Sequence, residues 1–108
     1  MKIVAVTACA GGIAHSYMAA EAIKKSAKKA GDEAKVEIQG SMGLENRLKQ
    51  SEIDEADMVL LVANIAVREI GRFKGKKIVE IDPGKFVADG DKSLLLAKEK
   101  GGFIPTNQ

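Results

Sequence analysis

The 108-residue sequence is poor in cysteine, proline and aromatic residues. A single cysteine excludes an intramolecular disulfide, a Cys-x-x-Cys redox pair and a cysteine-rich zinc site. Aromatic residues make up 4% of the chain and include no tryptophan, which makes a base-stacking surface for nucleic acid a poor interpretation. No segment reaches the roughly 20 apolar residues of a membrane-spanning helix. We therefore expect a cytoplasmic protein with no metal site and no cofactor.

The remaining composition is that of an ordinary globular domain, with 45% hydrophobic and 30% charged residues. The net charge of +2 is too small to indicate a nucleic-acid partner by itself. The length fits one domain with a core of its own. We expect residues 1–100 to form this domain and residues 101–108 to form a tail or the start of a linker.

Two hydrophobic periods alternate along the chain. Residues 3–6 and 58–63 are continuous apolar runs, typical of strands that are buried on both faces. Residues 35–39 and 77–81 mix charged and apolar side chains, which is typical of strands at a sheet edge. Residues 14–30 place apolar side chains at spacings of three and four and predict a helix. The shorter elements predicted are helices or helical turns at 44–50, 51–55, 65–70 and 93–100, and a turn at 82–84 that ends the last strand.

This alternation predicts an α/β fold, namely a three-layer sandwich with helices on both faces of the sheet. Right-handed crossovers favour a four-stranded parallel sheet of order 2-1-3-4. In that order the chain switches direction between the first and third strands. Ligands bind at the carboxyl ends of the strands at such a switch point. The segment that follows the first strand, residues 9–16, lies there.

Residues 9–16, CAGGIAHS, contain the only cysteine and the only histidine of the chain. The first N–H groups of a helix lack intrahelical acceptors and carry partial positive charge, and glycines let successive N–H groups curve around an anion. The same field, together with a nearby imidazolium, favours the thiolate form of a cysteine. The loop therefore predicts a nucleophile, Cys9, at a site where a phosphoryl group is bound.

Each residue of this loop also has a purely structural interpretation. Lone cysteines are often inert core residues, and Ser16 is a suitable helix cap. His15 is compatible with a polar helix start and Gly11-Gly12 with a tight turn. Their joint placement at the switch point favours the nucleophile.

Two well-known phosphate-binding loops fit less well. A dinucleotide site needs Gly-x-Gly-x-x-Gly and an acidic residue after the second strand, where this chain has Gln39-Gly40. A cysteine phosphatase loop has the form Cys-x5-Arg-Ser/Thr, and here His15 occupies the arginine position. An imidazole lacks the bidentate fork of arginine, and no aspartate offers itself as a general acid. The loop is thus better suited to holding a phosphocysteine than to hydrolysing it quickly.

The residues of this loop and helix start, CAGGIAHSYMAAE (9–21), resemble the active-site signature of fructose-family enzyme IIB domains of the bacterial phosphoenolpyruvate-dependent sugar phosphotransferase system (PTS). That signature typically runs Cys-Pro-Thr-Gly-Ile-Ala-His-Thr, an aromatic residue and Met-Ala-Ala-Glu. Residues 36–46 and 53–59 resemble the family's stretches after the second strand and before the third. Two positions depart from the signature: Ala10 replaces its proline and adds an N–H donor, and Gly11 replaces its threonine and adds conformational freedom.

The resemblance implies a phosphoryl carrier of a sugar PTS. Such a domain accepts the phosphoryl group from a phosphohistidine of enzyme IIA and passes it to a fructose-like sugar in the membrane-embedded enzyme IIC. It is cytoplasmic, peripheral to the membrane through enzyme IIC, and has no nucleic-acid partner. His15 would orient or charge-balance the loop. The implied site residues are Cys9 as the phosphocysteine intermediate and Ala10, Gly11, Gly12, Ile13, Ala14, His15 and Ser16 as the phosphate-binding loop. Two alternatives stay open, a phosphatase-like hydrolase that uses the same loop and a non-catalytic regulatory module of the same fold.

Overall fold

The computed structural model describes residues 1–10, 12–40 and 43–103, and its centre is a five-stranded sheet. The strand order is β3-β2-β1-β4-β5, in which the last four are parallel and β3 is antiparallel to β2. The α/β class is confirmed, and the parallel strands follow the predicted 2-1-3-4 order. The strands are β1 (Lys2–Ala8), β2 (Glu33–Gly40), β3 (Gly43–Glu45), β4 (Met58–Ala63) and β5 (Ile78–Ile81). The helices are α1 (Ile13–Lys29), α2 (Gln50–Glu55), the 3-10 helix η1 (Ile70–Phe73), α3 (Pro83–Ala88) and α4 (Gly90–Lys100).

The two apolar runs of the sequence form the central strands β1 and β4. They pair in parallel from Ile3↔Met58 to Ala8↔Ala63. Every residue of β1 except Lys2 is buried, as expected for a strand covered on both faces. Their carboxyl ends lie next to each other, so the loops that follow β1 and β4 meet at one edge of the sheet.

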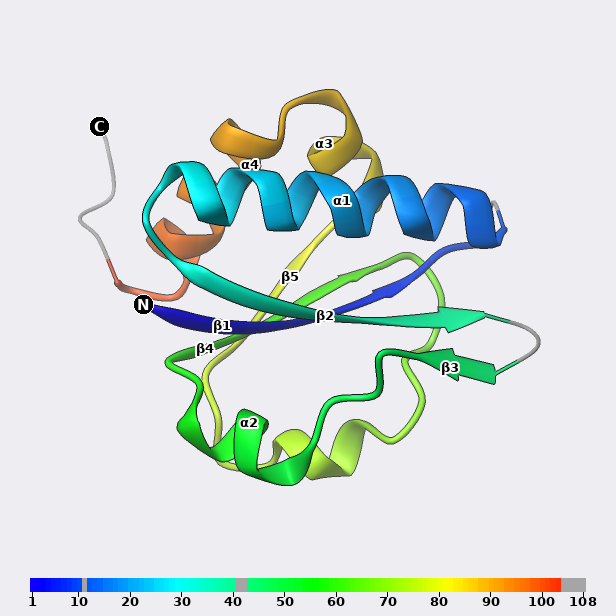
Figure 1. Ribbon diagram of the computed structural model, residues 1–108, viewed down its shortest axis with the longest axis horizontal. Coiled ribbons are helices and arrows are strands. Elements are labelled where there is room, and N and C mark those ends of the chain that lie inside the picture. Colours follow the sequence, from blue (N-terminus) through cyan, green and yellow to red (C-terminus); the bar gives the residue numbers. More distant parts are fainter. Residues whose placement is uncertain (11, 41–42, 104–108) are drawn as a thin grey trace.

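Helices cover both faces of the sheet and give the predicted three layers. Figure 1 shows α1, α3 and α4 on one face and α2 with η1 on the other. The first face carries the larger core, which includes Ile23 of α1 and Phe86 of α3. Ile53 of α2 and Phe73 of η1 belong to the second core. Each of these four side chains is fully buried.

The sheet differs from the prediction at the edge next to β2. The helix expected at residues 44–50 is wrong, because Gly43–Glu45 forms β3 and pairs with β2 from Gly40↔Gly43 to Ile38↔Glu45. Consequently β2 is an interior strand and the sheet is not wholly parallel. Residues 41 and 42, between β2 and β3, lie outside the described residues. A three-residue strand has too short a pattern to be separated from a helix start by periodicity.

Two further elements differ because their caps override the local pattern. The segment at 82–84 does end β5, but it also begins α3: the Asp82 carboxylate accepts a hydrogen bond from Gly84 N at 2.9 Å, and Pro83 occupies the first turn. Asp89 caps α4 by accepting from Lys92 N at 3.1 Å, so this helix begins three residues before the predicted start at 93. The short helix expected at 65–70 is wrong: residues 64–69 form bends and turns, and the 3-10 helix η1 starts only at Ile70.

At the carboxyl end, Gly101 caps α4 and Phe103 packs against the larger core. The division into a domain of residues 1–100 and a tail of residues 101–108 stays a prediction. In the part of the chain that the structure describes, no helix is long and apolar enough to cross a membrane.

Candidate functional site

A cavity of about 290 Å³ opens at the carboxyl ends of β1 and β2, beside the loop that follows β4. This is the switch point at which the sequence predicted a ligand. Three separate segments therefore build one site. The residues that line the cavity are Ala8, Cys9, Ala10, Gly12, Ile13, Gln39, Gly40, Ile65, Ala66 and Arg68.

Cys9 is the first residue after β1 and lies in the wall of the cavity, with 7% of its surface exposed. Helix α1 begins four residues later, and among the described residues no side chain caps it and none in its first turn is acidic. The amide groups of this turn are thus available to an external anion, and the helix dipole favours negative charge there. The structure brings together the thiol and the helix N-terminus as the sequence predicted.

Gly12 is the N-cap of α1, and its backbone shows why a glycine is needed. Its φ of 104° and ψ of 175° lie in a region that is almost restricted to glycine. Its N–H donates to Cys9 O at 3.3 Å, and its carbonyl accepts from Ser16 N at 3.3 Å. The turn therefore couples the position of Cys9 to the start of the helix. Gly11, the other glycine of the pair, lies outside the described residues.

The N–H of Ala10 has a partner within the protein. It donates to the side-chain oxygen of Asn64 at 2.7 Å, and Asn64 N donates to Ala8 O at 3.1 Å. Asn64 follows β4 directly, so it joins the loops after β1 and β4. The N–H that Ala10 adds in place of the signature's proline thus fixes the loop in this structure. Asn64 was missed by sequence reasoning, although its place after a central parallel strand was a usable signal.

His15 and Ser16 lie in the first turn of α1 but do not line the cavity as described. His15 is half-buried, and Ser16 is 1% exposed. Within the described residues the Ser16 hydroxyl has no hydrogen-bond partner, so it does not cap the helix. Ile13 borders the cavity and is 43% exposed. The roles of residues 10–16 in phosphate binding stay predictions.

Arg68 is the charged residue that sequence reasoning missed. It lies in the loop after β4, lines the cavity, and donates from its guanidinium to the Gly40 carbonyl. Its backbone is held on both sides by one buried amide: Arg68 N donates to Gln39 Oε1 at 2.8 Å, and Gln39 Nε2 donates to Arg68 O at 3.1 Å. The absence of an arginine within the Cys9 loop therefore does not mean that the site lacks one.

The Gln39 amide is itself anchored by a buried ion pair. Gln39 Nε2 donates to Glu37 Oε2 at 2.9 Å, and Arg72 of η1 donates to both oxygens of this carboxylate at 2.7 and 2.5 Å. Leu48 N adds a fourth hydrogen bond at 2.9 Å. Burial raises the pKa of Glu37, but the hydrogen bonds from Arg72, Gln39 and Leu48 outweigh it and hold the pKa below its ordinary value. Glu37 is thus a structural anion behind the site.

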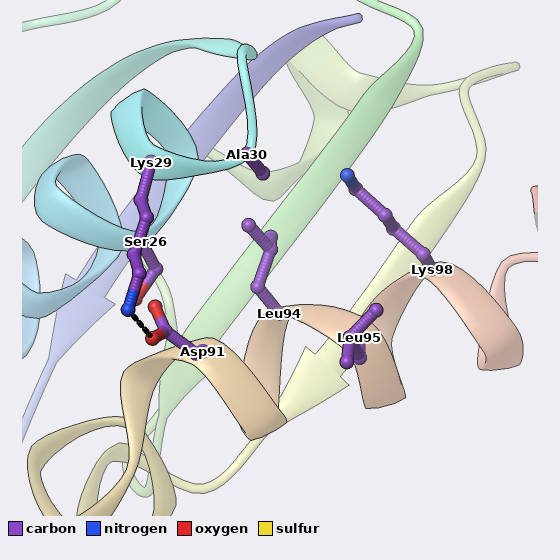
Figure 2. Close-up of a pocket in the computed structure, with 7 residues that line it drawn as sticks. All are labelled: Ser26, Lys29, Ala30, Asp91, Leu94, Leu95 and Lys98. Atoms are coloured by element: carbon purple, nitrogen blue, oxygen red, sulfur yellow. Dashed lines mark hydrogen bonds and ion pairs between the residues drawn. The ribbon is translucent and has the colours of Figure 1, made fainter.

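A second hollow lies between α1 and α4 (Figure 2). It is at the carboxyl end of α1, and since α1 has 17 residues this is roughly 25 Å from the helix start beside Cys9. Lys29 and Asp91 form an ion pair of 2.8 Å across it, and Leu94 and Leu95 supply apolar walls. The residues described around it include no thiol, whereas Cys9 lines the first cavity. Within the described chain, no cluster of three or more metal-ligating side chains occurs.

Comparison with known families matches residues 4–96 to the model described as "PTS system, Lactose/Cellobiose specific IIB subunit". This chain belongs to the PTS IIB family. A similar protein is the "PTS system fructose-like EIIB component 2" of Escherichia coli K12, with 50% identity over 90 residues that cover 83% of this chain and 85% of the relative. The IIB chain is also 41% identical over 107 residues to the fructose-specific EIIB'BC component of Rhodobacter capsulatus; the match covers 99% of the chain and 18% of that longer protein.

Solved structures of IIB proteins share the fold. The crystal structure of a predicted fructose-specific IIB from Escherichia coli has a TM-score of 0.83 and 32% identity, covering 98% of this chain and 93% of the other. A domain of fruA from Bacillus subtilis has a TM-score of 0.79 and 36% identity, covering 99% and 100%. The resemblance noted in the sequence is confirmed.

The first prediction concerns the backbone of Gly12. Replacing Gly12 with Ala places a side chain at a φ that L-residues avoid, so the IIB protein should lose about 1–3 kcal/mol of unfolding free energy. Steric contact adds nothing, since a Cβ at Gly12 meets no atom within 4 Å. Urea unfolding measures the loss.

Gly71→Ala is the matched control for Gly12→Ala. Gly71 is also free of neighbours within 4 Å but lies in η1 without a positive φ, so this change should be neutral or slightly stabilising. Equal stability of the two variants would contradict the strain at Gly12.

The second prediction concerns the buried ion pair. Glu37→Gln leaves the Arg72 guanidinium, which is 10% exposed, without its anion, and should cost about 3–5 kcal/mol at pH 7. Because the pKa of Glu37 is lowered in the folded state, its stabilisation is present above the pKa of the unfolded carboxyl group and disappears as the pH falls through the folded value. The difference between wild type and variant should therefore narrow below about pH 4.5. Unfolding curves from pH 7 to pH 3 measure this.

Glu21→Gln controls for the change of side chain itself. Glu21 pairs with Lys24 at 3.6 Å on the exposed face of α1, so its unfolding curves should stay close to those of the wild type. A gap between Glu37→Gln and wild type that did not depend on pH would argue against the ionised pair.

Proposed function

We propose that this IIB protein carries a phosphoryl group on Cys9 between a phosphohistidine donor and a fructose-like sugar, and that it does so in the cytoplasm. The observation that supports this most directly is the placement of Cys9 in the wall of a cavity, beside the uncapped N-terminus of α1. The helix start supplies backbone N–H groups, and such groups bind phosphate oxygens well.

The reaction consists of two phosphoryl transfers at one sulfur atom. In the first, the Cys9 thiolate attacks phosphorus, the S–P bond forms, and the N–P bond of the phosphohistidine breaks with its electron pair returning to the imidazole. In the second, a sugar hydroxyl oxygen attacks the same phosphorus and loses its proton, and the S–P bond breaks to release the thiolate. No net oxidation occurs, and the chain returns to its starting state.

The donor is an enzyme IIA and the acceptor is a sugar bound to a membrane permease, enzyme IIC. Relatives support this pairing, because the EIIB'BC protein of Rhodobacter capsulatus and the EIIABC protein of Bacillus subtilis carry further components in one polypeptide. The fructose-like sugar follows the names of these relatives, whereas the family model is named for lactose and cellobiose. Through enzyme IIC the carrier is peripheral to the inner face of the membrane. We assign the carrier to residues 1–100 and a linker or tail to residues 101–108.

Exposed apolar side chains around the cavity suit transient docking of both partners. Ile13 and Ile65 line the cavity and are 43% and 49% exposed. Tyr17 and Met18, one turn further along α1, are 40% and 54% exposed. Since donor and acceptor must each bring a reacting atom to the same sulfur, one apolar rim around Cys9 serves both in turn.

The composition of the cavity favours a carrier over a hydrolase. A phosphatase needs a carboxylic acid or an equivalent group to protonate its leaving group and to activate water. Among the described lining residues there is no aspartate or glutamate. A phosphocysteine formed here is therefore protected from rapid attack by water until an acceptor docks.

The third prediction tests the acceptor residue. Wild-type protein incubated with phosphoenolpyruvate, the general PTS proteins and a fructose-type enzyme IIA should gain one phosphoryl group, while Cys9→Ser should gain none because its hydroxyl is a much weaker nucleophile than a thiolate. Intact-mass spectrometry measures both. Circular dichroism and unfolding curves check that Cys9→Ser keeps the fold.

Three outcomes separate the alternatives. A phosphoryl group on both proteins would remove Cys9 from the mechanism. Release of inorganic phosphate without an acceptor, as fast as the donor supplies it, would indicate the hydrolase. If the wild type accepts no phosphoryl group from either of two phosphorylated fructose-type donors, the result would indicate the non-catalytic module.

A further inference from the structure

The Cys9 loop alone does not balance the negative charge of a phosphocysteine. A phosphoryl group brings a charge of about −1.5 to −2, whereas a helix N-terminus supplies the equivalent of about +0.5. His15, the cation expected from the sequence, does not line the cavity as described. A further positive group at the cavity wall would balance the charge.

Arg68 is the one charged side chain among the described residues that line the cavity. It comes from the loop after β4, a different segment from the one that carries Cys9 and the helix start. Its guanidinium has five N–H donors in a planar fork, a geometry that matches phosphate oxygens, and the Gly40 carbonyl is one acceptor for it. A neutral carbonyl competes weakly with a phosphoryl dianion for this group.

The other two arginines of the chain are already committed. Arg72 pairs with Glu37, and Arg47 forms a bidentate pair with Glu69. Within residues 1–10, 12–40 and 43–103, Arg68 makes no salt bridge with a carboxylate. Its charge is therefore available to a ligand in the cavity.

The position of Arg68 is also fixed in advance. The side-chain amide of Gln39, which is 3% exposed, accepts one hydrogen bond from the Arg68 backbone and donates another to it. Glu37 and Arg72 hold Gln39 from behind. An anchored backbone lowers the entropy that is lost when the side chain engages a ligand. The Glu37–Arg72 pair therefore also supports the backbone of Arg68 through Gln39.

We infer that the Arg68 guanidinium binds the phosphoryl oxygens on Cys9 and stabilises the phosphocysteine. This inference rests on the proposed function, since it requires a phosphoryl group at Cys9. Arg68 and the helix start then both bind the group. Removing the cation weakens the phosphocysteine relative to the phosphohistidine of the donor, so the transfer equilibrium moves back toward the donor.

The test compares Arg68→Gln and Arg68→Lys in the full chain. Each variant is equilibrated with phosphorylated enzyme IIA, and intact-mass spectrometry measures the ratio of phosphorylated to unphosphorylated variant. Loss of one charge-assisted contact should lower this ratio about tenfold in Arg68→Gln. Arg68→Lys keeps the charge but not the fork, and should recover part of the loss.

A second readout reports charge at the phosphoryl group itself. The midpoint of the ³¹P chemical-shift titration of the phosphocysteine should rise in Arg68→Gln, because a nearby cation favours the dianion. Arg47→Gln is the matched control: it breaks the pair with Glu69, which is adjacent to Arg68, and keeps the Arg68 cation. Neither its ratio nor its titration should change. Because Arg68 is exposed, we expect its variants to fold. Unfolding curves check this for all variants.

The outcomes distinguish the inference from the function on which it rests. A phosphorylated wild type with an unchanged ratio and titration in Arg68→Gln overturns the role of Arg68 and leaves the carrier function standing. An equal effect of Arg47→Gln also overturns it, because disturbance of the loop would then explain the loss. A wild type that accepts no phosphoryl group from a charged donor overturns both.

Discussion

The arrangement of the site depends on one buried carboxylate. Glu37 is fully buried in β2 and accepts four hydrogen bonds, two from Arg72, one from Gln39 and one from Leu48 N. Moving an ion pair out of water costs several kcal/mol, which only full hydrogen bonding offsets. The pair is therefore better understood as a positional constraint than as a source of stability. It fixes η1 and the segment before α2 against β2, and through Gln39 it fixes the loop that carries Arg68.

The sequence predicts well those elements whose signal is local. The continuous apolar runs at 3–6 and 58–63 became the central strands, and the period of three and four at 14–30 became α1. It predicts poorly the elements that depend on distant partners. Glu37 looked like the exposed position of an alternating edge strand, yet its partner Arg72 lies 35 residues away and buries it. The same holds for β3, which exists because it pairs with β2 rather than because of its own three residues.

The same distinction between local and distant partners applies to the residues of the site. Cys9, Gly12 and the start of α1 are contiguous in the chain, so their juxtaposition followed from spacing alone. Asn64 and Arg68 reach the site from the loop after β4, more than fifty residues later, and only the parallel pairing of β1 with β4 brings them there. The rule that ligand sites form where several strands end could have directed attention to this loop. It could not have shown that the Ala10 N–H is already taken by Asn64.

A carrier must hold its phosphoryl group firmly enough to survive between partners and loosely enough to pass it on. In a cysteine phosphatase the arginine belongs to the cysteine loop and therefore moves with the sulfur. Together with a general acid it favours hydrolysis of the phosphocysteine. In this protein the cation comes from a separate loop, anchored by Gln39, and no carboxylate lines the described cavity. The negative charge of the phosphoryl group is then balanced, while no carboxylate activates water to attack it. The hydroxyl of an incoming sugar, brought with its own binding site, is the group that completes the transfer.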